Sequence, residues 1–85
     1  MPEYEIRITK TAQKQLDKLS NSVANILIET IQTLSFNPRP NGCKKLKGRN
    51  GYRIRQGDYR IIYEVYDKLL IVEVIAIGNR KDIYE

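Results

Sequence analysis

The chain has 85 residues, with 15 lysines and arginines against 10 aspartates and glutamates, no histidine and one cysteine. This length supports a single small domain, which we take as residues 1–85. One cysteine excludes an internal disulfide and a cysteine-based zinc site, and the lack of histidine excludes His-ligated metals and a histidine general base. We therefore expect no metal and no cofactor. The net charge of +5 favours an anionic partner, although a solvated basic surface would have the same charge.

Apolar runs such as Leu69–Val72 are far too short to span a bilayer. The first five residues carry acids where a secretory signal would carry bases. The sequence therefore predicts a cytoplasmic protein that does not contact a membrane.

The first half of the chain predicts one strand and two helices. Residues 3–8 alternate apolar and charged side chains, which is typical of a half-buried strand. Thr9 or Thr11 is placed to cap a helix, and the segment 20–22 offers the cap of a second helix that runs from Val23 to about Phe36. The apolar positions that we expect to face the core are Ala12, Leu16 and Leu19 on the first helix and Val23, Ile26, Leu27, Ile31 and Leu34 on the second.

The second half predicts a loop over residues 37–51 and strands over 52–56, 59–66 and 69–77. Gly57-Asp58 and Asp67-Lys68 have the composition of two-residue hairpin turns. The resulting order is β-α-α-β-β-β. We expect an α+β fold, with a helical hairpin packed on one face of a largely antiparallel four-stranded sheet.

The two turns fix a register. They place Arg55 opposite Arg60 and Val65 opposite Leu70, and side chains then alternate between the two faces of the sheet. The face that we assign to the helices carries Ile54, Ile61, Tyr63, Val65, Leu70, Val72 and Val74. The other face carries Arg53, Arg55 and Arg60, with Ile62, Glu64, Ile71, Glu73 and Ile75 around them.

Arg55 opposite Arg60 is an unfavourable pair, because like charges directly across a sheet are destabilising. One explanation is that Glu64 or Glu73 neutralises the arginines on the sheet surface. The explanation that we favour is an anion site, in which the guanidinium groups hold phosphate oxygens through paired hydrogen bonds.

The segment from Lys44 to Arg60 contains seven bases and one acid, Asp58. Tyr52 and Tyr59 are interleaved with these bases and are available for stacking, unless their strand faces commit them to the core. Bases with aromatic residues among them are typical of proteins that bind single-stranded nucleic acid. The seven bases are Lys44, Lys45, Lys47, Arg49, Arg53, Arg55 and Arg60.

Three stretches in order resemble the RelE/ParE superfamily of bacterial and archaeal toxins: Lys45-Leu46-Lys47-Gly48, the strand pair YRIRQGDYRIIY at 52–63, and GNRKDIY at 78–84. Members are the toxin halves of toxin–antitoxin pairs. RelE-like members cut mRNA in the ribosomal A site, whereas ParE-like members poison DNA gyrase without nuclease activity. The full basic set and a tyrosine near the C-terminus favour the RelE-like type, which implies a ribosome-dependent mRNA endoribonuclease that arrests translation.

The resemblance also implies site residues. Arg53 and Arg55 match two basic positions that are lysines in the best-known RelE, and Arg60, Arg80 and Tyr84 match its arginines and C-terminal tyrosine. These five are the expected catalytic residues, and Lys44, Lys45, Lys47 and Arg49 are the expected RNA- or ribosome-binding residues. Arginine stays protonated, so the general base is left open.

The implied partners are a cognate acidic antitoxin of the RelB type, the ribosome and mRNA. Two alternatives stay open: a ParE-type gyrase inhibitor without nuclease activity, and a basic nucleic-acid-binding module without toxicity.

Overall fold

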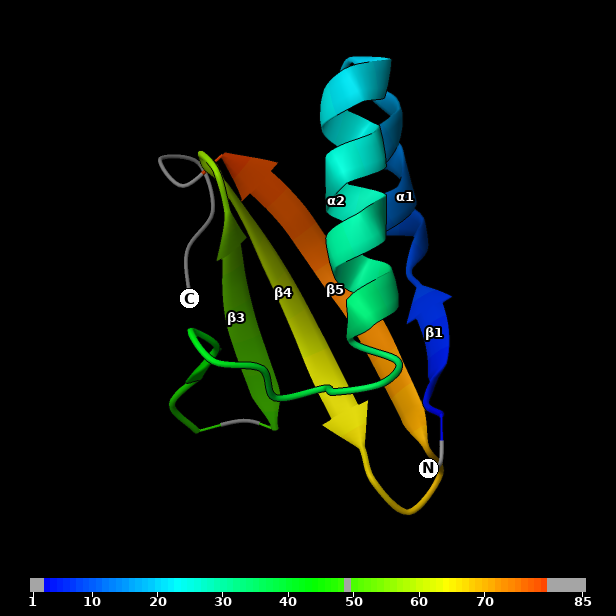
Figure 1. Cartoon of the computed structure of the whole chain (residues 1–85), viewed down its shortest axis with the longest axis vertical. Helices are drawn as coiled ribbons and strands as arrows, with labels where there is room; N and C mark the ends of the chain where they lie inside the picture. The colour runs from blue at the N-terminus through cyan, green and yellow to red at the C-terminus, as the bar shows by residue number, and fades with distance from the viewer. Residues whose placement is uncertain (1–2, 49, 80–85) are drawn as a thin grey trace.

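The computed structural model describes residues 3–48 and 50–79. Its elements are β1 (Glu5–Ile8), α1 (Lys10–Asp17), α2 (Asn21–Thr33), β2 (Lys44–Lys45), β3 (Gly51–Gln56), β4 (Tyr59–Tyr66) and β5 (Ile71–Asn79). They form a five-stranded sheet in the order β1-β5-β4-β3-β2, antiparallel except between β1 and β5. Both helices lie side by side on one face of the sheet (Figure 1).

The predicted α+β class is confirmed, and the predicted four strands are one too few. The additional strand, β2, consists of two lysines inside the segment that the sequence assigns to loop. Short as it is, β2 pairs with Tyr52 and Arg53 of β3 and so forms the edge of the sheet. Its two residues carry no apolar alternation, which is the pattern that would have revealed it.

Both helices begin at caps that the sequence predicts. The Thr9 side chain accepts a hydrogen bond from the Ala12 amide at 3.2 Å, and the Ser20 side chain accepts one from the Val23 amide at 3.4 Å. Helix α2 ends at Thr33, short of the expected Phe36, because the last amides bond three residues back and tighten the turn before Pro38. Within the described part of the chain, neither helix is long and apolar enough to cross a membrane.

The core lies between the two helices and one face of β4 and β5. Leu27 and Ile31 are the buried positions of α2, one turn apart, and Leu34, the residue that caps its C-terminal end, continues the same stripe. The sequence predicts Ile26 on this stripe as well, but Ile26 is 49% exposed and does not belong to it. The buried residues of the sheet are Ile61, Tyr63 and Val65 on β4 and Val72, Val74 and Ile77 on β5.

The register between β4 and β5 differs from the predicted one. Tyr66 pairs with Ile71, so the connection has four residues, Asp67–Leu70, in place of a two-residue turn at Asp67-Lys68. Val65 consequently pairs with Val72, and Leu70 leaves the core face, 37% exposed and with a positive φ of 53°. The physical reason is that this loop bonds to other segments: the Leu70 carbonyl accepts from the Glu5 amide, and the Asp67 carboxylate is held by side chains outside the hairpin.

A β-bulge accommodates one additional residue in β5. Ile62 pairs with Ala76 while the next residue, Tyr63, pairs with Val74, so Ile75 has no partner position on β4. The bulge keeps both Val74 and Ile77 pointing into the core, which strict alternation along β5 would not allow.

Candidate functional site

Three arginines of β3 and β4 share the face of the sheet that the helices leave uncovered. Arg55 pairs with Arg60, and Arg53 pairs with Ile62. Ile61, next to Arg60, is completely buried under the helices, so residues of the opposite parity point to the other face. The predicted register of the β3–β4 hairpin is therefore confirmed, and it brings the three guanidinium groups together.

The three arginines repel one another. Arg53 is only 6% exposed, and burial together with the positive charges of Arg55 and Arg60 lowers the pKa of its guanidinium group. Arg55 is exposed and Arg60 half-buried, so the group opens to solvent toward the tip of the hairpin. Such clustering is stabilised when an anion binds between the guanidinium groups, because each can donate two parallel hydrogen bonds to phosphate oxygens.

The neighbouring strand β5 carries small residues where it runs beside Arg60 and Ile62. Across β5, Arg60 pairs with Gly78, and Ile62 pairs with Ala76. A hydrogen atom and a methyl group therefore stand where larger side chains would crowd the arginines.

The acidic residues on the same face form a pair of their own. Glu64 and Glu73 stand directly opposite each other. The Tyr66 hydroxyl donates to the Glu64 carboxylate at 2.7 Å, and Glu73 pairs with Arg7 on β1 and helps to raise the pKa of that arginine, after the larger effect of Glu5. Glu64 is diagonal to Arg53 but four residues from Arg60 along β4, about 13 Å away. The alternative of neutralisation by these carboxylates thus has a geometric basis at Arg53, whereas Glu64 lies four residues along β4 from Arg60.

The predicted basic loop contributes one lysine to this face. Lys44 pairs with Arg53 and so points to the same side, whereas Lys45 pairs with Tyr52 and points to the side of the helices. Lys47 is exposed beyond the end of β2. The remaining predicted site residues, Arg49, Arg80 and Tyr84, lie outside the described residues.

The two tyrosines of the basic segment are committed to the helix side. Tyr52 packs against the core and stacks on Tyr63, with ring centroids 5.8 Å apart, and Tyr59 also packs against the core. Neither shares the face of the arginines, so of the two possibilities that the sequence left open, commitment to the core is the one observed. Among the described residues, no three acidic or cysteine side chains gather in a group that could hold a metal ion.

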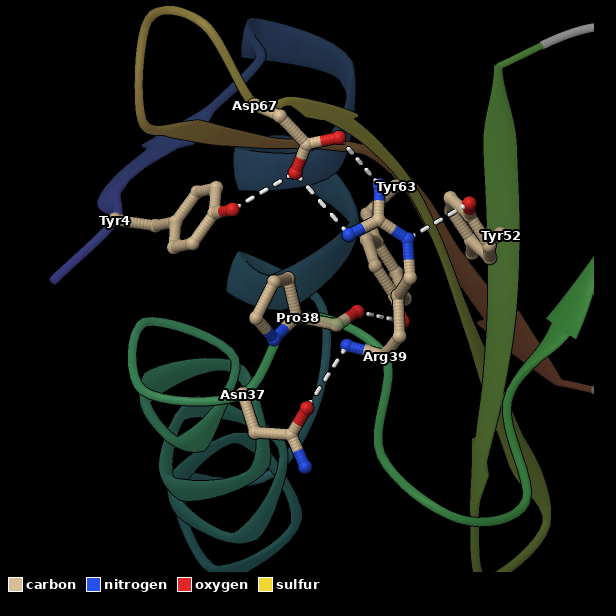
Figure 2. Close-up of polar contacts among 7 residues, drawn as sticks. All are labelled: Tyr4, Asn37, Pro38, Arg39, Tyr52, Tyr63 and Asp67. Carbon is tan, nitrogen blue, oxygen red and sulfur yellow. Dashed lines mark hydrogen bonds and ion pairs between the residues drawn. The ribbon is translucent and has the colours of Figure 1, made fainter. Parts of the chain in front are cut away.

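Sequence reasoning missed a cluster centred on Arg39, in the connection between α2 and β2 (Figure 2). Its guanidinium group donates to both Asp67 carboxylate oxygens, at 3.1 and 2.7 Å, and its Nε donates to the Tyr52 hydroxyl at 2.9 Å. The guanidinium carbon also lies 5.2 Å from the centroid of the Tyr52 ring. The Tyr4 hydroxyl donates to Asp67 at 2.7 Å, and hydrogen bonds from Arg39 and then Tyr4 lower the pKa of this carboxyl group.

A buried contact lies beside this cluster. The Tyr63 hydroxyl donates to the Pro38 carbonyl oxygen at 2.7 Å, and burial is the main cause that raises the pKa of this phenol, followed by the nearby Cys43. Together these contacts attach the start of the α2–β2 connection to the sheet. No local pattern announces them, since the partners lie 13 to 28 residues apart in sequence.

Comparison with known proteins identifies the family. A family model described as the ParE toxin of the type II toxin–antitoxin system parDE matches residues 6–84. The chain is 32% identical to Toxin RelE from Mycobacterium tuberculosis over 83 residues. This alignment covers 95% of this chain and 86% of that protein.

The fold is similar to solved toxin–antitoxin complexes. The match to the RelBE2 complex from M. tuberculosis has a TM-score of 0.84 and 28% identity, covering 96% of this chain and 97% of that one. The match to the archaeal RelE–RelB complex from Pyrococcus horikoshii OT3 has a TM-score of 0.84 and 29% identity, covering 95% and 99%. The chain therefore belongs to the RelE/ParE superfamily of toxins from type II toxin–antitoxin systems, and within it the chain is RelE-like.

Proposed function

We propose that this toxin is a ribosome-dependent mRNA endoribonuclease that arrests translation in the cytoplasm. The observation that carries the proposal is the group of Arg53, Arg55 and Arg60 on the face of the sheet that the helices do not cover, with Lys44 beside it. Fixed guanidinium groups suit a reaction in which negative charge accumulates on a phosphate. The core cluster of the fold lies on the opposite face of the sheet.

The proposed reaction is attack of an RNA 2′-hydroxyl on the adjacent phosphate, with departure of the 5′-oxygen. It needs removal of the 2′ proton, stabilisation of a phosphorane-like dianion and protonation of the leaving oxygen. Arg55 and Arg60, which face each other, would hold the non-bridging oxygens of the dianion. Arg53 is less exposed and lies next to both arginines, and it would stabilise the same negative charge from a more buried position.

The remaining roles rest on the sequence resemblance. Arg80 would add a further guanidinium group and Tyr84 would orient the substrate base or assist proton transfer. Lys44, Lys45, Lys47 and Arg49 would bind RNA or the ribosome, with Lys44 on the face of the arginines. Because arginine is a poor base, positioning of the mRNA by the ribosome would supply part of the acceleration, and naked RNA should be a poor substrate.

The same argument supports an antitoxin as partner. The similar solved structures from M. tuberculosis and P. horikoshii are complexes of a toxin with a RelB-type antitoxin. An acidic segment that folds on binding would neutralise a chain of net charge +5, most directly by covering its arginine face. We propose such a cognate acidic antitoxin for this toxin.

The second candidate is inhibition of DNA gyrase without nuclease activity, which the match of residues 6–84 to the ParE model favours.

Two assays separate the candidates: primer extension on a reporter mRNA in a translation reaction, and DNA supercoiling by purified gyrase. We expect cut mRNA at ribosome-bound positions, unaffected supercoiling and little cleavage of free RNA. Arg60→Ala should abolish cutting, whereas Arg7→Ala, an arginine of β1 on the same face that pairs with Glu5, should not. Inhibited supercoiling with intact mRNA would select the gyrase candidate.

A further inference from the structure

We propose that Arg39 is a positioning residue: it holds the connection between α2 and β2 against the sheet, so that Lys44 stands beside Arg53 in the arginine face. Arg39 bonds through its guanidinium group to Tyr52 and Asp67, which are not among the expected catalytic residues. Its side chain lies on the helix side of the sheet, bonded to Tyr52 and Asp67 (Figure 2). The inference rests on the proposed function, since it assigns Lys44 a share in binding RNA.

The Arg39 side chain joins three parts of the chain that are distant in sequence. Asp67 belongs to the β4–β5 connection, Tyr52 to β3, and Tyr4, which also donates to Asp67, to the segment before β1. The planar guanidinium group uses two nitrogens on the carboxylate and the third on the phenol, an arrangement that lysine has too few fixed donors to reproduce. The Arg39 side chain is 40% exposed, so it makes these contacts at the solvent-facing surface of the sheet end.

The path from Arg39 to Lys44 is short and constrained. Four residues intervene, beginning with Pro40, whose carbonyl accepts a hydrogen bond from the Cys43 amide at 3.1 Å. Gly42 in this turn has a φ of 93°, which a residue with a side chain rarely adopts. Because the segment is short and constrained, a displacement of Arg39 would also move Lys44.

β2 needs such an anchor because its own pairing is weak. It has only two residues, and it places Lys44 directly opposite Arg53, a like-charge pair that opposes the approach of the two strands. Beyond β2, the buried Leu46 donates its amide to the Gly51 carbonyl at 2.9 Å and fixes the far side. On the near side, the corresponding fixed points are the Tyr63 contact to Pro38 and the Arg39 cluster.

The test uses a fluorescein-labelled 12-nucleotide single-stranded RNA, whose affinity for the purified toxin is measured by anisotropy over a range of salt concentrations. The variants are Lys44→Gln, Arg39→Ala, Asp67→Asn and the double variant Arg39→Ala with Lys44→Gln. Circular dichroism identifies a temperature at which all are folded. Asp67→Asn is the decisive variant, because it breaks the cluster and at the same time makes the toxin more positive.

We expect Lys44→Gln to weaken binding and to reduce the salt slope by about 0.7, the value for one lost phosphate contact on a single strand. Arg39→Ala and Asp67→Asn should weaken binding by a similar factor, and the double variant should bind no more weakly than Lys44→Gln alone. Amide hydrogen exchange at Leu46, which needs no RNA, should accelerate in Arg39→Ala and Asp67→Asn.

Tighter binding by Asp67→Asn, as net charge alone demands, would overturn the positioning role, and so would additive losses in the double variant. If Lys44→Gln weakens binding while Asp67→Asn leaves both binding and exchange unchanged, only the role of Arg39 fails. If Lys44→Gln leaves binding unchanged, the assignment of the arginine face to RNA fails as well.

Discussion

Arg55 of β3 stands directly opposite Arg60 of β4, on the face of the sheet away from both helices. Like charges in this position are destabilising by up to about 1 kcal/mol relative to a neutral pair. Burial, followed by the charges of Arg55 and Arg60, lowers the pKa of Arg53, which lies diagonal to Arg60, and the second cause reflects the same repulsion. A bound phosphate would offset this repulsion, because both guanidinium groups can donate hydrogen bonds to its oxygens.

The first prediction follows from this pair. Arg55→Ala and Arg60→Ala should leave the melting temperature unchanged or raise it, because each removes repulsion, while both abolish most mRNA cleavage. Sulfate, a phosphate analogue, should raise the melting temperature of the wild type more than that of either variant, since a ligand of the folded state stabilises it.

Arg7→Ala is the control for this experiment, because it removes an arginine that pairs with Glu5 at 2.6 Å, on β1 and remote from the arginine pair. It should respond to sulfate as the wild type does. A marked fall in melting temperature for Arg55→Ala or Arg60→Ala, with cleavage retained, would mean that these arginines are structural partners and not a phosphate site.

The second prediction uses two adjacent lysines as a matched pair. Lys44 shares the face of Arg53, whereas Lys45 pairs with Tyr52 and points to the opposite side. Lys44→Gln should therefore weaken cleavage of ribosome-bound mRNA more than Lys45→Gln, although both variants lose one charge from the same strand. Equal losses would show that the basic loop acts through its total charge and that the pairing of β2 has no part in it.

The β3–β4 hairpin was predictable because its turn is coded locally. Gly57 has a positive φ of 61°, as the leading residue of such a turn requires, and a one-residue slip would have moved Ile54 and Ile61 out of the core. The same logic located the caps at Thr9 and Ser20. For the candidate site, this register alone was sufficient to bring Arg53, Arg55 and Arg60 together.

The parts that the sequence did not reveal depend on contacts between distant segments. The β4–β5 connection resembles a two-residue turn, yet Tyr4 and Arg39 hold Asp67 and extend it to four residues. The bulge at Ile75 shifts the pairing of β4 and β5 by one residue inside the sheet, where no turn residue marks its position in the sequence. β2 and the cluster of Arg39 belong to the same class, since their partners lie on strands that come together only in the folded chain.

The third prediction concerns acid. Hydrogen bonds from Arg39 and Tyr4 lower the pKa of Asp67 in the folded chain, below the value of about 3.9 of an unfolded aspartate. The stabilisation is therefore complete above pH 4 and is lost as the pH falls through the folded value. Asp67→Asn should melt below the wild type at pH 7, and this difference should shrink toward pH 2.

Thermal melts of four proteins measure this effect: wild type, Asp67→Asn, Arg39→Ala and the double variant. In the Arg39→Ala background, Asp67→Asn should change the melting temperature much less, because the main cause of the pKa shift has been removed. A difference between wild type and Asp67→Asn that is constant from pH 7 to pH 2 would contradict the assignment.

The last prediction concerns alkali and Tyr63. Burial raises the pKa of this phenol above its ordinary value of about 10, so the folded chain keeps the proton that an unfolded chain releases. The contribution of Tyr63 to stability is therefore complete below pH 10 and declines as the pH rises above it. Tyr63→Phe loses the hydrogen bond to the Pro38 carbonyl and should be destabilised by about 1–2 kcal/mol at pH 7, while its stability should fall less steeply between pH 10 and pH 12.

Denaturant titrations across this pH range measure both effects. Tyr66→Phe is the comparison: a hydrogen bond to Glu64 on the same strand also raises the pKa of this exposed phenol, so its loss should flatten the alkaline decline less than the loss of the buried Tyr63. Equal slopes for wild type and Tyr63→Phe would show that the buried phenol does not govern the alkaline limit of this fold.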